Sequence, residues 1–301
     1  MKNNGNTPGF SQRHPFIFGF MLIMVAMVLL GGTMAALRVW LFGDELAIHP
    51  GAKLGIVRLE GPIVGSEKVN DWIAELKRDD SVKGVLLRVN SPGGVVAPSQ
   101  EMFQAVRKLA KVKPVVCSMA SMAASGGYYV ACGADVVFAN PGTITGSIGV
   151  RSEFVDLRSL MEKLGIRHEL FVTGKYKGMG SPFHEITPAQ REQLQGMIDD
   201  VHSQFVHDVA EARKMDVKVV ENLAQGQPFT GRQAQENGLV DKLGGMDDAL
   251  TYLKAMCKLE GKVPLRDGPE TKKSGLLKEL LSSIDFHLEM SEGPSLRIVA
   301  R

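Results

Sequence analysis

The chain has 301 residues, 44% of them hydrophobic, so it is long enough to build a sizeable core as one large domain or two small ones. Its 35 basic and 33 acidic residues leave a formal net charge of +2, and aromatic residues are not interleaved with the basic ones. These features exclude global disorder and argue against nucleic acid as a partner.

The cysteines indicate neither a disulfide framework nor a metal site. Cys117, Cys132 and Cys257 are too few and too scattered for such a framework, and none forms a CxxC pair of the zinc-binding type. We therefore expect core thiols or isolated surface thiols, and no bound metal.

An uncharged apolar run extends from Pro15 to Leu37, between Arg13 and Arg38. It is long enough to cross a bilayer, which takes about 20 residues. The alternative is a cleaved signal peptide with a cleavage site near residues 34–36, although a secretory apolar core needs only about 7–15 residues. We predict a retained transmembrane anchor over residues 15–37, preceded by a cytoplasmic segment over residues 1–14.

The charges on either side of this run favour an N-terminus inside the cell. Lys2 and Arg13 precede the run, whereas Arg38 is soon followed by the acidic pair at residues 44–45. Basic residues accumulate on the cytoplasmic side of membrane helices. We therefore expect the rest of the chain to face the periplasm or the exterior, joined to the anchor by a linker over residues 38–53.

Beyond this linker, β-rich apolar runs alternate with amphipathic helices, which is typical of an α/β domain. The predicted strands cover residues 54–59, 82–89, 114–119, 135–139 and 167–172. The predicted helices cover residues 66–77, 101–109, a segment beginning near 125, 188–214 (with Thr187 as N-cap), a short helix and turn within 230–245, and 247–256. With no internal repeat, we expect one domain over residues 54–260.

Residues 261–301 are predicted to form a C-terminal tail. The composition over 262–270 is that of a loop, and an amphipathic helix over 276–288 places its leucines near one face. Such a face suits a partner or a membrane surface, but more commonly it docks on its own domain.

A glycine pair follows the second predicted strand, in the sequence Asn90-Ser91-Pro92-Gly93-Gly94. Glycine lets backbone N–H groups approach a ligand closely, as an oxyanion hole requires. An ordinary strand-to-loop turn has the same composition, so this motif alone does not distinguish the two.

A serine opens a predicted helix at the end of the third strand. Ser125 would gain there from the helix dipole, and its small neighbours leave room for a substrate carbonyl. Small residues also occur wherever helices pack closely on sheets. The surrounding sequence is not the GxSxG elbow of α/β-hydrolases, which argues against that fold.

A nucleophilic serine needs a base. Of the seven histidines, only His168 and His184 lie near a predicted strand end, and neither has a recognisable triad setting. Lysine is the other candidate, because a lysine desolvated in an apolar pocket can accept a proton near neutral pH. Lys175 and Lys177 follow the last predicted strand, but most lysines are solvated surface charges, so composition alone selects neither.

Four ordered blocks resemble the signal peptide peptidase A family. They are NSPGG, MAASGGYY, PGTITGSIGV and GKYKGMGSPF, and the resemblance runs from about Leu54 to Leu253. It implies a fold similar to the Clp protease proteolytic subunit and the crotonases, here with an N-terminal transmembrane helix. It also implies a serine peptidase with a Ser-Lys dyad that needs no metal or organic cofactor.

The resemblance assigns a role to each matching residue. Ser125 becomes the nucleophile and Lys177 the base, so that Lys175 is a bystander. Neutral Lys177 would take the Ser125 proton during attack on a peptide carbonyl and then protonate the leaving amine, before water hydrolyses the acyl-enzyme.

The same resemblance implies the supporting groups. Gly94 and Gly126 would supply the two oxyanion N–H groups, and Ser147 in the GSIG block would hydrogen-bond the lysine amine. The implied substrates are remnant signal peptides and other membrane-associated peptides, cleaved at the outer face of a bacterial inner membrane.

The resemblance also bears on assembly. Longer members of the family carry two such domains in tandem, whereas this chain has one, so the resemblance implies a homo-oligomer. The spacing of Ser125 and Lys177 does not distinguish a dyad within one protomer from a dyad shared between neighbouring protomers. Two alternatives remain. A crotonase-like acyl-CoA enzyme would bind CoA without a reactive serine, and a non-enzymatic membrane scaffold would be expected to have lost Ser125 or Lys177.

Overall fold

The computed structural model describes residues 14–42, 51–269 and 299–300. The chain divides into a small unit, Met1–Pro50 with Glu260–Val263, and a large unit, Gly51–Leu259 with Pro264–Arg301. The amphipathic helix expected over residues 276–288 lies outside the described residues.

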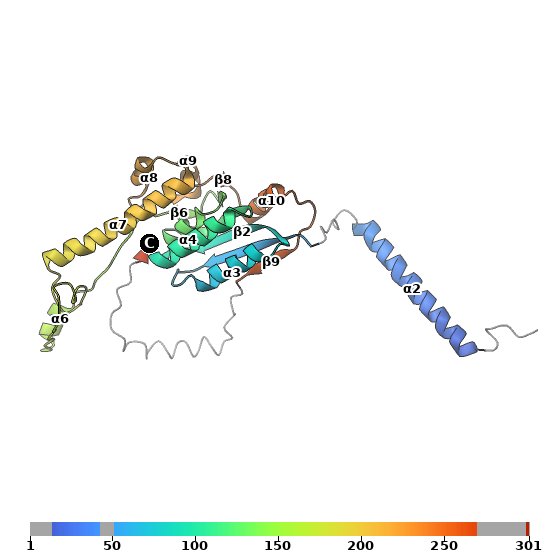
Figure 1. The fold of residues 1–301 in the computed structure, drawn as a ribbon, viewed down its shortest axis with the longest axis horizontal. Helices are drawn as coiled ribbons and strands as arrows, with labels where there is room; N and C mark the ends of the chain where they lie inside the picture. Colours follow the sequence, from blue (N-terminus) through green and yellow to red (C-terminus); the bar gives the residue numbers. More distant parts are fainter. Residues whose placement is uncertain (1–13, 43–50, 270–298, 301) are drawn as a thin grey trace, which may run out of the picture. The chain divides into compact units, whose positions relative to one another are not determined.

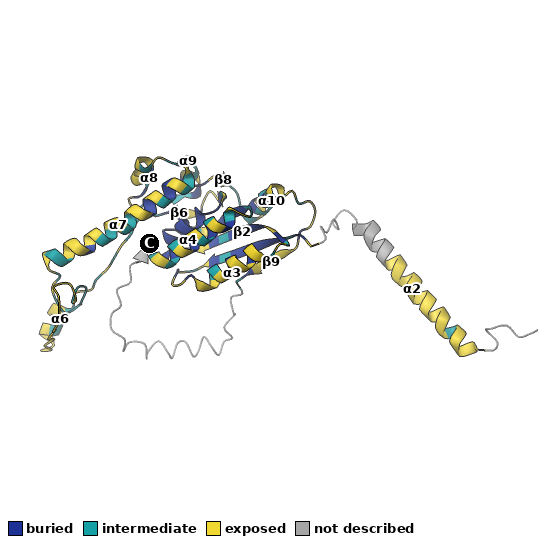
Figure 2. Ribbon diagram, viewed as in Figure 1, coloured by how far each residue is buried: buried dark blue, intermediate teal, exposed yellow. Residues whose placement is uncertain are grey.

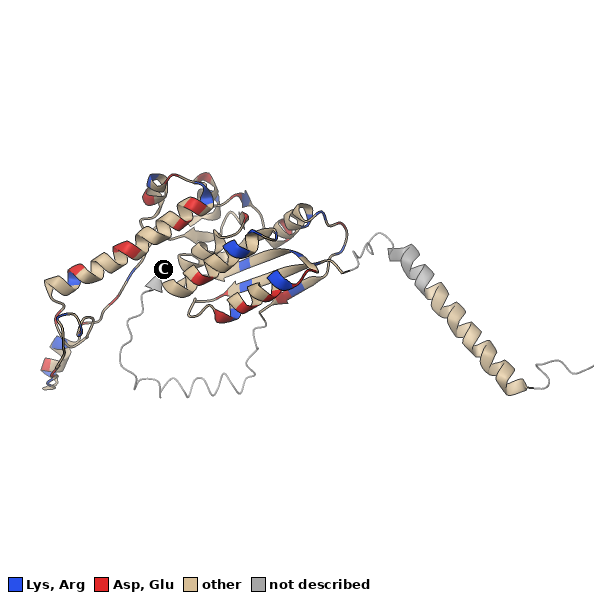
Figure 3. Ribbon diagram, viewed as in Figure 1, with Lys and Arg blue, Asp and Glu red and all other residues tan. Residues whose placement is uncertain are grey.

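The described part of the small unit contains one long helix, α2 (Pro15–Phe42). Its stretch Pro15–Met34 has a mean hydropathy of 2.4, and none of it is buried (Figure 2). The described side chains of α2 include no Lys, Arg, Asp or Glu (Figure 3). By length and composition the helix fits a membrane span, and a signal sequence near the N-terminus fits equally well.

The large unit is built on a mixed eight-stranded sheet. Its strands follow the order β7-β6-β4-β2-β1-β9, with β5 paired to β4 and to β8. All of these pairs are parallel except β6 with β7. The strands are β1 (Lys53–Glu60), β2 (Val82–Ser91), β4 (Val115–Ala124), β5 (Val136–Ala139), β6 (Ile144–Gly146), β7 (Pro228–Thr230), β8 (Lys242–Leu243) and β9 (Leu265–Gly268).

Helices connect the parallel strands and cover the sheet, as crossover connections between parallel strands require (Figure 1). A further two-stranded pair joins β3 (Gly94–Val95) to β10 (Val299–Ala300). The helices are α3 (Glu67–Arg78), α4 (Val96–Ala110), α5 (Gly126–Ala131), α6 (Arg158–Lys163), α7 (Pro188–Arg213), α8 (Val217–Leu223), α9 (Gly231–Glu236) and α10 (Met246–Met256).

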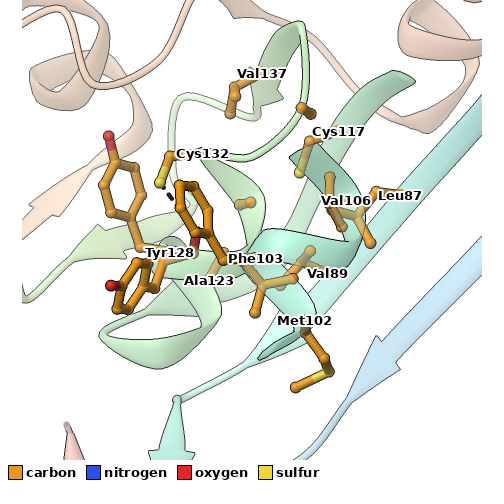
Figure 4. Packing of buried hydrophobic residues seen from close by; sticks show 14 of the residues in the cluster. Leu87, Val89, Met102, Phe103, Val106, Cys117, Ala123, Tyr128, Cys132 and Val137 are labelled. Atoms are coloured by element: carbon orange, nitrogen blue, oxygen red, sulfur yellow. Dashed lines mark hydrogen bonds between the residues drawn. The ribbon is translucent and has the colours of Figure 1, made fainter. Parts of the chain in front are cut away.

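Apolar side chains pack on both faces of the sheet because alternate residues of a strand point to opposite sides. On one side of β2, Leu87 and Val89 join the main core with side chains from α4 and α5 (Figure 4). On the other side, a Cβ atom placed on Gly84 would lie 2.9 Å from Cδ1 of Leu253 in α10. The central strands are therefore buried on both faces, which explains their nearly continuous apolar sequences.

Helix α7 begins at the predicted cap. The Thr187 hydroxyl accepts a hydrogen bond from the Gln190 backbone, and the Gln190 side chain accepts one from the Thr187 N–H. The later part of α7 docks on the core, where Phe205 stacks on Tyr129 with ring centroids 4.2 Å apart. The first part buries only Leu194 and extends toward α6 (Figure 1).

The strand predicted over residues 167–172 is wrong. The structure has neither strand nor helix there, and Phe171 is 89% exposed. A β-rich sequence forms a strand only where a neighbouring strand and a packing surface are available, and the described residues offer neither at this position. The loop predicted over residues 262–270 also needs correction, because β9 lies within it and extends the sheet beside β1.

The remaining predicted elements of the domain are confirmed, with shifted ends in two cases. The helix predicted from residue 101 begins at Val96, and the strand predicted to end at residue 119 continues to Ala124. This extension matters for the site because it carries the chain directly to Ser125.

Candidate active site

Ser125 forms a sharp turn between β4 and α5. Its φ of 53° and ψ of −121° place it in a region that side-chain-bearing residues seldom occupy. Its N–H donates to the Gly146 carbonyl at 2.8 Å, and its carbonyl accepts from the Tyr129 N–H at 2.9 Å. Residues in such strained conformations cluster at functional sites and cost about 1–3 kcal/mol each. The two backbone hydrogen bonds hold Ser125 in this conformation against that cost.

The Ser125 side chain is fully buried and unpaired. Its exposed fraction is 0%, and Oγ has no hydrogen-bond partner among the described residues. Leaving a buried hydroxyl without a partner costs about 1–3 kcal/mol. In a native protein such a group calls for a functional explanation.

The glycines after Ser125 allow α5 to approach the turn that follows β2. A Cβ atom on Gly127 would lie 2.7 Å from the Ser91 carbonyl oxygen, and one on Gly126 would lie 2.4 Å from Ser99 Oγ. Both distances are too short for a side chain. The small residues of the ASGG block are therefore required by packing as well as by any chemistry.

Gly94 lies on the other side of this contact, with its N–H group directed away from Ile63. The Ile63 N–H donates to the Gly93 carbonyl at 2.9 Å, and the Val95 N–H donates to the Ile63 carbonyl at 2.8 Å. Because polar groups alternate along an extended chain, the Gly94 N–H between these two bonds points to the opposite side. A Cβ on Gly94 would lie 2.0 Å from the Ile63 carbonyl oxygen, so only glycine fits.

The opposite edge of β3 holds an extended segment of the same chain. Strand β10 is antiparallel to it, with Val299 opposite Val95 and Ala300 opposite Gly94. Since Ile63 occupies one edge of β3, β10 occupies the edge toward which the Gly94 N–H points. This edge therefore accepts an extended peptide backbone.

Ser147 is next in sequence to Gly146, the hydrogen-bond partner of Ser125. Its hydroxyl donates to the Gly226 carbonyl at 3.3 Å, and its N–H donates to the Gln227 carbonyl at 3.0 Å. A hydroxyl that donates one bond still has lone pairs that can accept another, for example from an amine.

Lys177 is not joined to Ser125 within this chain. It lies on a segment that we call the arm, residues 151–187, in which no residue is buried. Lys177 is exposed, and its N–H donates to the Gly174 carbonyl at 3.3 Å. The structure thus brings Ser125 and Gly126 together with Gly94 and leaves Lys177 on the arm.

The arm is coloured exposed or intermediate throughout (Figure 2), and several of its large apolar side chains are exposed. Phe171 is 89% exposed, Val155 67% and Leu164 62%, and four others share this property: Leu160, Ile166, Leu170 and Val172. Helix α6 itself buries nothing. Large apolar patches on a soluble surface mark sites of contact with another molecule.

The two histidines considered from the sequence lie on the arm. His168 Nδ1 and His184 Nε2 are 3.0 Å apart, and the His168 ring also packs against Phe183. Ser125 Oγ has neither of them as a partner. Among the described residues, no histidine is hydrogen-bonded to the serine.

Two of the thiols are core residues, as expected. Cys117 and Cys132 are buried, and burial raises the pKa of Cys132 to about 12, so neither is a reactive thiolate. Cys257 is partly exposed. Over the part of the chain that the structure describes, no group of three or more His, Cys, Asp or Glu side chains forms a metal site.

Two buried threonines were missed in the sequence and help to position Ser125. The Thr145 hydroxyl donates to the Ala123 carbonyl at 2.7 Å, and the Thr143 hydroxyl donates to the Ala120 carbonyl at 2.6 Å. They tie the segment leading into β6 onto the end of β4, just before the serine. The period-two spacing of T-I-T was the available signal, because it places both hydroxyls on one face.

Comparison with known proteins gives this geometry a context. Residues 107–260 match the model of "Peptidase family S49". A Methanocaldococcus jannaschii protein with the provisional name of a protease is 36% identical over 268 residues, covering 84% of this chain and 86% of its own length. An Enterococcus faecium protein provisionally named signal peptide peptidase SppA is 40% identical over 206 residues.

A longer relative, named Protease 4, comes from Haemophilus influenzae and is 36% identical over 208 residues. This chain spans 60% of the length of the E. faecium protein and 34% of the length of the H. influenzae protein.

The fold and these matches define a serine peptidase. The chain belongs to peptidase family S49, and the resemblance to signal peptide peptidase A is confirmed. Peptides are its substrates. This result decides against the acyl-CoA enzyme and the non-enzymatic scaffold.

Proposed function

We propose that this chain is a membrane-anchored endopeptidase that cleaves remnant signal peptides, and other membrane-associated peptides, with a Ser125–Lys177 dyad. The observation that carries the proposal is the buried, unpaired Oγ of Ser125 in a chain whose Lys177 lies on an exposed arm. A nucleophile without its base in one copy obtains that base from another copy.

The chemistry uses the serine, the lysine and two backbone donors. Neutral Lys177 removes the proton from Ser125, whose Oγ attacks the peptide carbonyl, and the N–H groups of Gly94 and Gly126 hold the oxyanion. The protonated lysine gives its proton to the leaving amine. A water molecule, deprotonated by the same lysine, then releases the acyl group and regenerates the serine.

In this proposal the arm of one protomer docks on the next and brings Lys177 to the neighbour's Ser125. The exposed apolar residues of the arm support such docking, because the described residues of their own chain leave them uncovered. Enclosing a lysine among apolar side chains favours its neutral form. Ser147 then accepts a hydrogen bond from the incoming amine. The assembly is a homo-oligomer with head-to-tail contacts.

The substrate backbone binds along β3. The antiparallel pairing of β10 with Gly94 and Val95 supports this role, since a peptide in the same place would present its carbonyls to the Gly94 N–H. Main-chain pairing reads no side chains. It therefore suits peptides of varied sequence, such as signal peptides.

The remaining parts of the proposal concern location and fold. Residues 15–37 anchor the protein in a bacterial inner membrane, with residues 1–14 in the cytoplasm and the peptidase domain, residues 54–260, in the periplasm or the exterior. The apolar stretch Pro15–Met34 and the named relatives support an anchor. The domain is of the Clp protease and crotonase type, in line with its parallel central strands. No cofactor takes part.

Labelling with a fluorophosphonate tests the nucleophile. The full chain in detergent, treated with the probe and digested, is expected to carry one adduct on Ser125, and Ser125→Ala is expected to remain unlabelled. Ser121→Ala is the matched control, because Ser121 is an exposed serine on the same strand and its loss should leave labelling intact. An adduct on another serine, or labelling that survives in Ser125→Ala, would contradict the proposal.

A further inference from the structure

We propose that Ser91 is a positioning residue for the oxyanion hole, holding the turn that directs the Gly94 N–H. The inference rests on the proposed function and adds a residue that takes no part in the chemical step. Ser91 is the last residue of β2, and its side chain is fully buried.

The Ser91 hydroxyl makes two hydrogen bonds inside the turn. Its Oγ donates to the Gly61 carbonyl at 2.7 Å and accepts from the Gly93 N–H at 3.1 Å. One side chain thereby connects the loop after β1 with the glycine pair after β2.

The turn itself has little stiffness without this hydroxyl. Pro92 has no N–H to donate, and Gly93 adopts a φ of +92°, where glycine has wide conformational freedom. The Gly93 carbonyl is held by the Ile63 N–H at 2.9 Å, but its N–H is held by Ser91 Oγ. Removing the hydroxyl releases one of the two bonds that fix the residue directly before Gly94.

Ser91 also supports the other half of the hole. A Cβ atom on Gly127 would lie 2.7 Å from the Ser91 carbonyl oxygen. The first turn of α5 therefore packs closely against Ser91. Ser91 and Ala123 are opposite each other in the pairing of β2 with β4. The same residue therefore touches both segments that supply the oxyanion donors.

The expected effect is on catalysis more than on binding. Oxyanion donors act only within a narrow range of distance, and a misplacement of about 1 Å can cost on the order of 100-fold in rate. We expect Ser91→Ala to lower kcat by about 10- to 100-fold, with KM changed by less than about 2-fold because the β3 edge remains. The pH profile should keep its shape, since the base is untouched.

The matched control is Ser118→Ala. Ser118 is also fully buried in the sheet, and its Oγ accepts a hydrogen bond from Arg88 at 2.8 Å, away from the glycine turns. A purely structural role of Ser91 predicts that both variants lose a similar amount of thermal stability and that neither loses kcat when assayed while folded. A positioning role predicts that only Ser91→Ala loses kcat.

The experiment compares kcat, KM, Tm and the rate of Ser125 labelling by a fluorophosphonate in the full chain. Ser91→Cys keeps a similar size and a weak hydrogen-bond donor, so its kcat should lie between those of the wild type and Ser91→Ala. If Ser91→Ala does not fold, Ser91→Cys is compared with Ser118→Ala in its place. Equal kcat for the folded Ser91 variant and Ser118→Ala would overturn the inference. Activity remaining in Ser125→Ala would instead overturn the proposed function, so the two failures are distinguishable.

Discussion

The backbone nitrogen of Gly94 lies beside Gly126, since a Cβ atom placed on Gly126 would stand 3.3 Å from it. The two residues belong to different turns, one after β2 and one after β4. They meet because these strands are parallel neighbours, and the carboxyl ends of parallel strands lie at the same edge of the sheet. Two backbone donors next to a buried serine are what an oxyanion hole requires.

Gly126→Ala should therefore abolish most of the activity. The new methyl group would lie 2.4 Å from Ser99 Oγ and 3.3 Å from the Gly94 nitrogen, in the space that the proposed mechanism assigns to the oxyanion. We expect kcat to fall by about 100-fold or more. Gly196→Ala is the control, because nothing lies within 4 Å of a Cβ at this position in α7. It should keep full activity and gain up to about 1 kcal/mol of helix stability.

The dyad variants should separate catalysis from folding. Ser125→Ala and Lys177→Arg are expected to show no peptidase activity above background. Ser125→Ala should unfold at the same temperature as the wild type or higher, because the substitution removes a buried hydroxyl that has no partner. Lys177→Arg should unfold as the wild type does, because the lysine is exposed in its own chain.

Lys175→Ala is the matched control for the base. Lys175 is on the same exposed turn, where its Nζ lies 4.7 Å from the Tyr176 ring centroid, so its loss should leave turnover unchanged. An inactive Lys175→Ala together with a fully active Lys177→Ala would reverse the assignment of the base.

Activity should increase toward alkaline pH. The proposed base works only when it is deprotonated, and an ordinary lysine titrates at about 10.4 before burial lowers its pKa. A plot of log kcat/KM against pH should therefore show its ascending limb well above the titration of histidine. An ascending limb at about pH 6.5 would match the pKa typical of histidine. If that limb disappears in His168→Asn or His184→Asn, the lysine mechanism is ruled out.

The strands and helices of the core were accessible from the sequence because the physical signals are local. Parallel strands buried on both faces give nearly continuous apolar runs, as in Val82–Val89, where only Lys83 and Arg88 are charged, and Thr187 with Pro188 marks the start of α7. Gly94 and Gly126 were predicted from the motif blocks as oxyanion donors, a role that stays a prediction, and the structure places the two residues side by side.

What the sequence did not predict depends on partners distant in the chain. Residues 167–172 have the composition of a strand but no neighbour to pair with, whereas β9 lies in a charged, loop-like stretch and pairs with β1 through Leu265 and Leu54. The two hydrogen bonds of Ser91 depend on Gly61, which comes from a separate loop. No local pattern encodes such relationships.

The pairing of β10 with β3 predicts competition with the substrate. If a peptide binds along the same edge, removing the pairing should lower KM for a short peptide and leave kcat unchanged. The double variant Val299→Pro, Ala300→Pro does this in the full chain, because proline cannot donate to a ladder. Val299→Ile, which keeps a β-branched residue, is the control. A KM that is the same in the proline variant and the wild type would contradict a shared edge.

The most direct test of the central proposal mixes two inactive chains. Ser125→Ala and Lys177→Ala are co-assembled from the unfolded or dissociated state and assayed with a peptide. A site shared between protomers should restore about a quarter of the wild-type activity, because half of the serines are intact and half of their neighbours bring an intact lysine. Ser125→Ala mixed with the variant lacking both residues should stay inactive. Mixed oligomers that form normally and show no activity would contradict a dyad shared between copies.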